Sequence, residues 1–142
     1  MKILLVDGSN LIYRAFHANN LKNKKGERVG GAFGAVKMTL NLLKKFNPDI
    51  MVMAWDAGRS PARLALYPEY KAQRAKNRKP EDVEDIKNNI KVCQEIFKHL
   101  PVRQIIVQDM EGDDIIGYLS CKLKGEKIVV SNDHDFIQLV KD

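Results

Sequence analysis

The sequence has few cysteines and lacks any apolar run long enough to cross a membrane. Its two cysteines, Cys93 and Cys121, lie far apart and outside any C-x-x-C pattern, which gives little support for a disulfide framework or a zinc site. We therefore expect both to be reduced thiols in the core. The apolar start of the chain, Ile3 to Val6, stops at Asp7, far short of the roughly 20 residues that a membrane span requires. A signal peptide and a membrane partner are therefore not expected.

The composition is that of one compact domain with an excess of positive charge. The chain has 142 residues, of which 44% are hydrophobic and 30% charged, so it can bury a core and is expected to form a single domain over residues 1–142. The net charge of +6 and the isoelectric point near 9.3 suit a polyanionic partner such as nucleic acid.

Hydrophobic patterning predicts strands and helices in alternation. Short buried runs indicate strands at residues 2–6, 50–55, 102–107 and 127–131. Helices are indicated at 32–46, from 80 towards 101, at 113–123 and from 136 onward. The apolar stripes of the first two helices are Phe33, Val36, Leu40 and Leu43, and Val83, Ile86, Ile90, Cys93, Phe97 and Leu100. This alternation predicts an α/β fold, with a mostly parallel central sheet and helices on both of its faces.

Acidic residues follow each of the predicted strands. They are Asp7, Asp56, Glu111, Asp113, Asp114, Asp133 and Asp135. Because the carboxyl ends of parallel strands share one edge of the sheet, these acids are expected to converge although the sequence separates them. Crowded carboxylates without histidine or cysteine favour a hard cation, Mg²⁺ or Mn²⁺, and two such ions about 4 Å apart could hydrolyse a phosphodiester. Taken singly, Asp7 could instead be a turn residue, and Asp113 or Asp133 a helix cap.

Cations accumulate between residues 59 and 80, where the apolar periodicity fades. They are Arg59, Arg63, Lys71, Arg74, Lys76, Arg78 and Lys79, with Tyr67 and Tyr70 among them. Cations interleaved with aromatic rings are typical of a segment that binds single-stranded nucleic acid, because phosphates meet the cations and bases stack on the rings. A solvated basic loop without a partner is the alternative.

Five motifs follow one another along the chain: VDGSNLIYRAFHA (6–18), AWDAG (54–58), YPEYKAQR (67–74), EGDDIIG (111–117) and SNDHDFIQLV (131–140). In their order and at similar spacing they resemble the 5′-nuclease family of bacteriophage 5′-3′ exonucleases, flap endonucleases and the N-terminal nuclease domain of bacterial DNA polymerase I. The resemblance implies a PIN-like domain that binds two Mg²⁺ or Mn²⁺ ions. It implies that the ligands of the first ion are Asp7, Asp56, Glu111 and Asp113, that those of the second are Asp133 and Asp135, and that Asp114 supports both.

The resemblance also assigns roles to basic residues. The basic region at about 59–80 resembles the family's helical arch or clamp, through which a 5′ single strand passes. Lys71 and Arg74 match its phosphate-contacting pair and are expected to act in catalysis, with Tyr70 as a stacking ring. Arg14 and Arg63 match basic positions that meet phosphates near the site. The other cations expected to bind DNA are Lys76, Arg78 and Lys79.

The function implied by the resemblance is metal-dependent cutting of DNA at 5′ ends or 5′ flaps, in replication or repair, in the cytoplasm of a bacterium or a phage-infected cell. Family members continue into a helix-hairpin-helix region that grips duplex DNA, and this region is not expected within residues 1–142. A weakened activity is therefore expected, together with a missing C-terminal region or a partner subunit. Two alternatives stay open: a PIN-type ribonuclease, which does not need the Tyr-Lys-x-x-Arg clamp, and a non-catalytic module that binds DNA structures.

Overall fold

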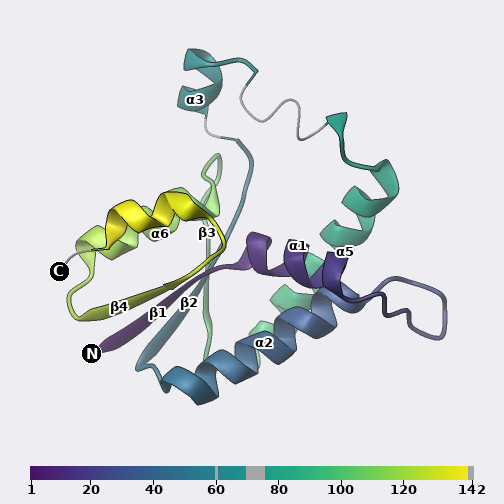
Figure 1. The fold of residues 1–142 in the computed structure, drawn as a ribbon, viewed down its shortest axis with the longest axis horizontal. Coiled ribbons are helices and arrows are strands. Elements are labelled where there is room, and N and C mark those ends of the chain that lie inside the picture. The colour runs from purple at the N-terminus through teal and green to yellow at the C-terminus, as the bar shows by residue number, and fades with distance from the viewer. Residues whose placement is uncertain (60, 70–75, 141–142) are drawn as a thin grey trace.

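The fold is a parallel sheet with helices on both sides. The computed structural model describes residues 1–59, 61–69 and 76–140. In chain order the elements are β1 (Lys2–Asp7), α1 (Gly8–Ala18), α2 (Gly30–Phe46), β2 (Ile50–Trp55), α3 (Pro61–Leu66), α5 (Pro80–Phe97), β3 (Arg103–Ile106), α6 (Gly112–Lys122), β4 (Glu126–Val130) and the 3₁₀ helix η1 (His134–Leu139). The four strands are all parallel, in the order β3-β2-β1-β4 (Figure 1). The predicted α/β architecture is confirmed.

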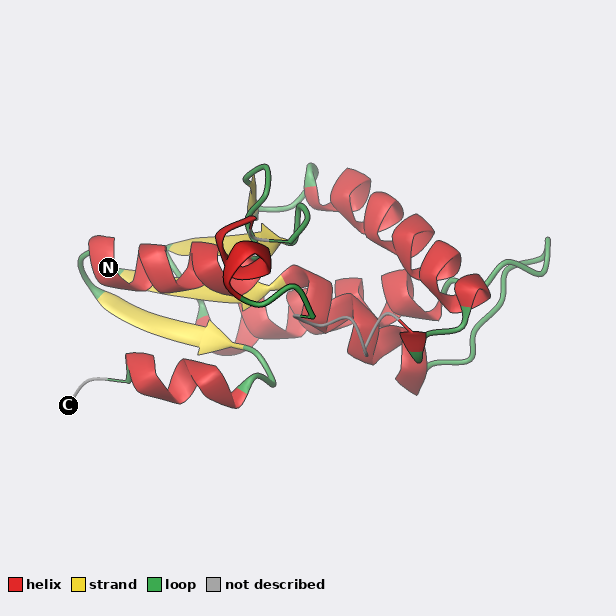
Figure 2. Ribbon diagram, turned by 90° about the horizontal axis from the view of Figure 1, so that it is seen from above, coloured by secondary structure: helices red, strands yellow, loops and turns green. Residues whose placement is uncertain are grey.

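Alternate residues of the central strands point to opposite faces of the sheet and pack into two separate cores. Leu4 and Val6 of β1 point to one face and pack with residues of α1, α2 and α5. Ile3 and Leu5 point to the opposite face and pack with α6. All four side chains are fully buried, and the view from above shows helices on either side of the sheet (Figure 2). Burial on both faces explains why the central strands read as continuous apolar runs.

Helix α1 is an element that the sequence patterning did not predict. Asp7 caps its N-terminus by accepting a hydrogen bond from the backbone N–H of Asn10. Its buried face includes Leu11, Ile12 and Phe16, at the spacing of an amphipathic helix. The helix therefore begins immediately at the Asp7-Gly8 step, which had suggested a loop.

The apolar stripe predicted for α2 is wrong at two positions. Phe33 and Leu40 are 54% and 47% exposed, whereas Ala32, Ala35 and Thr39 are buried. Small side chains allow α2 to lie close to α1 and α5, and this close packing turns the bulkier residues outward. The predicted stripe consisted of bulky apolar residues, whereas the face of α2 that the fold buries carries small residues.

Helix α5 carries the apolar stripe that its sequence predicts. Cys93 and Phe97 are fully buried, and Ile86, Ile90 and Leu100 pack against the same core. The helix ends at Phe97, so the chain leaves helical geometry before the predicted limit near Pro101. In the described part of the chain, no helix has the length and apolar character needed to span a bilayer.

The two cysteines lie in different surroundings. Cys93 is buried in the core, and burial raises the pKa of its thiol to about 12. Cys121 is exposed, so the expectation of a second core thiol is wrong. Both are free, as the spacing of the two residues predicted.

The single tryptophan of the chain provides a natural probe of folding. Trp55, the last residue of β2, is buried and stacks on Phe97 with 6.2 Å between ring centroids. Its indole N–H donates to Gln104 Oε1 at 3.1 Å. Unfolding removes all of these contacts, so the fluorescence of Trp55 is expected to report the loss of the core.

Candidate active site

Asp7 and Asp56 follow neighbouring strands and meet the start of α6. Asp7 is the last residue of β1, and its Oδ1 accepts from Asn10 N at 3.0 Å. Asp56 follows β2, and its Oδ1 accepts from Gly112 N at 2.6 Å. A Cβ on Gly112 would lie 3.2 Å from Asp56 Oδ1 and 3.5 Å from Asp7 Oδ1. Both carboxylates therefore lie against the first residue of α6, where the small glycine leaves room for them.

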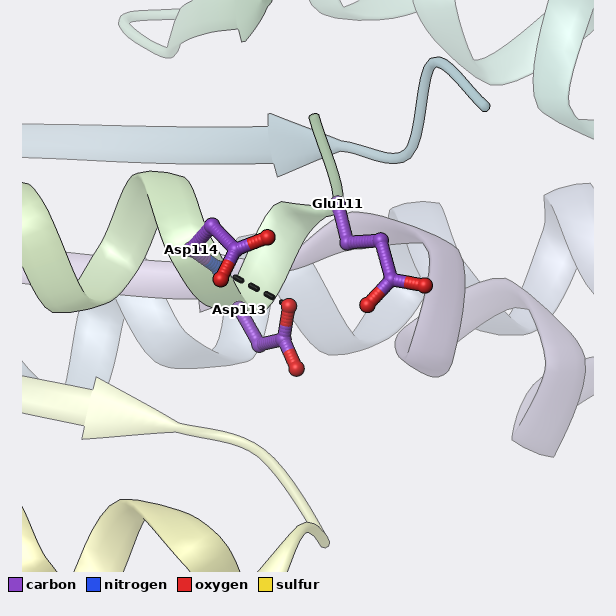
Figure 3. Close-up of side chains that lie close together, drawn as sticks. All are labelled: Glu111, Asp113 and Asp114. Carbon is purple, nitrogen blue, oxygen red and sulfur yellow. Dashed lines mark hydrogen bonds between the residues drawn. The ribbon is translucent and has the colours of Figure 1, made fainter. Parts of the chain in front are cut away.

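Three further carboxylates cluster where α6 begins. Glu111, Asp113 and Asp114, called here the acidic triad, each offer an oxygen, and these oxygens lie within 4.8 Å of one another (Figure 3). Asp114 N donates to Asp113 Oδ1 at 2.8 Å, which fixes the first turn of the helix. Glu111 is 4% exposed and precedes the helix as its N-cap, while the two aspartates are half-buried. Such a group of anions needs a cation nearby.

A guanidinium supplies that cation in the structure. Arg63, on the short helix α3, places Nη1 2.6 Å from Glu111 Oε2 and Nη2 2.5 Å from Asp114 Oδ1. Its Nη1 also lies 3.9 Å from Asp113 Oδ1. From the sequence Arg63 is expected to meet DNA phosphate, and in this structure its guanidinium lies against the acidic triad.

The carboxyl of Asp7 lies in a buried and acidic environment. Its pKa is raised from 3.8 to about 6, chiefly by burial and also by the nearby carboxylates of Asp56, Asp113 and Asp133, against the lowering effect of the hydrogen bond from Asn10. The pKa of Asp7 at the end of β1 therefore depends on carboxylates that follow β2, lie in α6 and lie in the loop after β4.

Asp133 and Asp135 lie after β4, at the start of η1. Both are exposed. Asp133 caps η1 by accepting from Asp135 N at 2.9 Å, so the cap role left open for Asp133 is seen. Asp7, for which a turn was left open, is the N-cap of α1, whereas Asp113 lies in the first turn of α6 and does not cap it. Among the described residues, the acidic triad is the one group of three or more possible ligands with oxygens this close together. The structure thus brings Asp7, Asp56 and the acidic triad to one place, and Asp133 within electrostatic reach of Asp7.

Some of the predicted DNA-binding residues lie in the part of the chain that the structure describes, and others lie outside it. Arg14 on α1 is exposed, and so are Lys76, Arg78 and Lys79 before α5. Arg78 Cζ lies 5.2 Å from the ring centroid of Tyr13, which places this cation beside α1. The remaining three predicted residues, Tyr70, Lys71 and Arg74, lie outside the described residues.

Two polar side chains of α1 belong to the site and were missed from the sequence. Ser9 Oγ accepts from Asp56 N at 3.0 Å, and so holds the loop after β2 against α1. Asn10 Oδ1 accepts from Asn132 N at 3.5 Å, which links α1 to the loop after β4. The available signal was the Ser-Asn pair after Asp7, because short polar residues at the start of a helix commonly bind neighbouring backbone.

Comparison with known proteins identifies the family. The family model described as "5'-3' exonuclease, N-terminal resolvase-like domain" matches residues 2–142. The chain belongs to this 5′-3′ exonuclease family. The chain is 35% identical over 147 residues to a 5′-3′ exonuclease of Aquifex aeolicus, covering 100% of this chain and 49% of that protein. It is 32% identical to DNA polymerase I of Streptococcus pneumoniae, covering 99% of this chain and 16% of the polymerase.

Solved structures of a bacteriophage enzyme share the fold. The bacteriophage T5 5′-exonuclease with bound zinc aligns at a TM-score of 0.81 and 26% identity, over 100% of this chain and 53% of that chain. The T5 flap endonuclease in a pseudo-enzyme-product complex with DNA and metal ions aligns at 0.75 and 25%, with the same coverage. The 142 residues thus span about half the length of these exonucleases and a smaller part of the polymerase.

Proposed function

We propose that this chain is the nuclease part of a metal-dependent 5′-3′ exonuclease or flap endonuclease that hydrolyses DNA at 5′ ends or 5′ flaps. The observation that carries the proposal is the acidic triad beside Asp7 and Asp56, at the shared carboxyl edge of a parallel sheet. Family membership supports the reaction class, and the T5 complex with DNA and metal ions supports a DNA substrate. The basic charge of the chain suits such a substrate.

The donor set fits a divalent cation. The triad attracts the positive charge of Arg63, and burial together with neighbouring carboxylates raises the pKa of Asp7, so a dication would stabilise the negative charge gathered here. Because every candidate ligand is a carboxylate, we propose Mg²⁺ or Mn²⁺ in preference to zinc. The proposed ligands are Asp7, Asp56, Glu111 and Asp113 for one ion, and Asp133 and Asp135 for a second, with Asp114 supporting both.

Bound ions would supply an activated water and charge stabilisation at the scissile phosphate. The residues of the chain do the rest. The hydrogen bonds from Gly112 to Asp56 and from Asn10 to Asp7 hold the two carboxylates in fixed orientations. We assign phosphate contact to Lys71 and Arg74 with Tyr70 as a stacking ring, and further backbone attraction to Arg14, Arg63, Lys76, Arg78 and Lys79. We propose that the basic region at about 59–80 serves as the arch, and the contact of Arg63 with the acidic triad supports this role.

Cleavage assays on matched substrates test the proposal. The chain is offered a 5′-flap DNA, a nicked duplex, a single strand and the flap sequence as RNA, each with Mg²⁺ or with EDTA. We expect Mg²⁺-dependent cleavage of DNA near the 5′ end, and loss of that cleavage in Asp113→Asn, with Asp109→Asn as a charge-matched control on an exposed loop. Cleavage of RNA in preference to DNA would indicate the ribonuclease alternative. Binding of the flap without any Mg²⁺-dependent cutting would indicate a binding module.

A further inference from the structure

Arg63 makes an unusual connection between an exposed helix and a largely buried cluster of acids. None of the six residues of α3 is buried, so the helix contributes no side chain to either core. Arg63 is 38% exposed, yet the side chain of its partner Glu111 is only 5% exposed. The ion pairs of Arg63 therefore hold a helix without a buried side chain against the start of α6.

The contacts of Arg63 engage carboxylates of the same acidic triad that could hold a metal ion. Glu111 Oε2 and Asp114 Oδ1 lie 2.6 and 2.5 Å from the two guanidinium nitrogens, and both oxygens belong to residues of the acidic triad. A carboxylate oxygen that accepts a short charge-assisted hydrogen bond has less electron density to offer a cation. A dication among these oxygens would also repel the guanidinium.

We propose that Arg63 is the built-in counter-cation of the acidic triad, that a divalent ion and Arg63 compete for these carboxylates, and that metal binding releases α3 from them. The proposal rests on the metal site proposed above. It adds that this site is closed by a side chain of the basic segment when no divalent ion is bound. Release of Arg63 then makes the guanidinium available to a phosphate at the moment when the site becomes competent.

Metal binding measured directly separates this competition from other roles of Arg63. Mn²⁺ is titrated into the 142-residue chain, and free Mn²⁺ is followed by electron paramagnetic resonance. Removing the competing cation in Arg63→Gln should tighten Mn²⁺ binding by about tenfold, the equivalent of one charge-assisted hydrogen bond. Arg63→Lys, which keeps the charge but loses the two-nitrogen fork, should fall between Arg63→Gln and the original chain. Arg59→Gln, an equal change of charge at an exposed position of the same segment, is the matched control.

Hydrogen–deuterium exchange tests whether metal binding releases α3 from the acidic triad. In the original chain, saturating Mn²⁺ should accelerate amide exchange in residues 61–67 and leave α5 unchanged. In Arg63→Gln the exchange of 61–67 should already be fast without metal and should not respond to Mn²⁺. The melting curve of Trp55 fluorescence confirms that each variant is folded.

The outcomes distinguish failure of the inference from failure of the metal site. Absence of Mn²⁺ binding in both the original chain and Arg63→Gln would refute the metal site itself, and the competition with it. Equal Mn²⁺ affinities, with no metal response in 61–67, would refute the competition and leave the site standing. Weaker binding in Arg63→Gln would overturn the inference differently, because it would show that Arg63 orients the ligands.

Discussion

The raised pKa of Asp7 makes the stability of the metal-free protein depend on pH. The carboxyl has a pKa of about 6 in the folded chain and an ordinary value of 3.8. Between these values the native state holds a proton that the unfolded state has lost, so stability falls as pH rises from about 4 to above 6. Each pH unit of difference corresponds to about 1.4 kcal/mol, so ionised Asp7 costs about 3 kcal/mol at pH 8.

Asp7→Asn should remove this cost and keep the helix cap. Asparagine retains a side-chain oxygen to accept from Asn10 N, and it stays neutral at every pH. In EDTA at pH 8 the variant should be more stable by up to about 3 kcal/mol, or about 6 to 12 °C in Tm for a chain of this length. At pH 4 the two proteins should be nearly equal, because Asp7 is then mostly protonated in the native state.

Urea unfolding followed by Trp55 fluorescence, at pH 4, 6 and 8, measures this difference. Asp109→Asn is the control, because it removes one exposed acid at a position whose φ of 62° asparagine tolerates. Excess Mg²⁺ should reduce the advantage of Asp7→Asn at pH 8, since metal bound to the native state stabilises the original chain. A stability difference that stays the same at pH 4 and pH 8 would refute the reasoning about burial and crowding.

Three further substitutions test the core and the basic segment. Asn89→Ala should lower the free energy of unfolding by about 2 to 4 kcal/mol, measured in urea, because the buried Asn89 side chain accepts from Ala32 N and donates to two backbone carbonyls. Lys71→Ala should lower the single-turnover rate on saturating flap DNA about a hundredfold, because a cation at the reacting phosphate stabilises the transition state. Lys79→Ala should mainly weaken DNA affinity in a salt-dependent manner.

The predictions for the core and for the basic segment each have a control and a result that would contradict them. For the core, Asn88→Ala is the matched control on the exposed side of α5 and should change stability by less than about 0.5 kcal/mol. Equal losses from the two asparagines would show that the hydrogen bonds of Asn89 contribute little. For the basic segment, equal losses from Lys71→Ala and Lys79→Ala, both rescued at low salt, would reduce Lys71 to one cation of a general patch.

The sheet was predictable because its signal is local. β1 and β2 are strands of six residues each, with apolar runs buried on both faces, Ile3 to Val6 in β1 and all of β2, and such runs appear directly in the sequence. The placement of acids at one edge then follows from the parallel order alone. Helix α1 was missed although Leu11, Ile12, Ala15 and Phe16 carry a helical pattern, because the Asp7-Gly8 step suggested a turn.

The exposed faces of α2 could not be predicted by the same reasoning. Phe33 and Leu40 have the spacing of a core stripe, and only the position of neighbouring helices decides which stripe is covered. A Cβ on Gly31 would lie 3.1 Å from Asn89 Oδ1, and one on Gly34 would lie 2.8 Å from the Cβ of Ala15. The glycines allow this close approach, and the resulting contact between helices is a tertiary property that periodicity within one helix does not contain.

The site neutralises its negative charge in two ways, and the sequence predicted neither, although it predicted that the acids would gather. Asp7 keeps its proton up to about pH 6, and the acidic triad binds the guanidinium of Arg63. The first depends chiefly on the burial of Asp7 and also on the strand order that gathers the acids. The second depends on a contact across 48 residues, made by a helix without a buried side chain, and no spacing rule reaches that far. Asp7 and Arg63 would both give way to a divalent ion, so metal affinity should fall as pH drops below 6 through Asp7, and should keep that dependence in Arg63→Gln. Loss of the pH dependence in Arg63→Gln would show that the two neutralising groups act as one system.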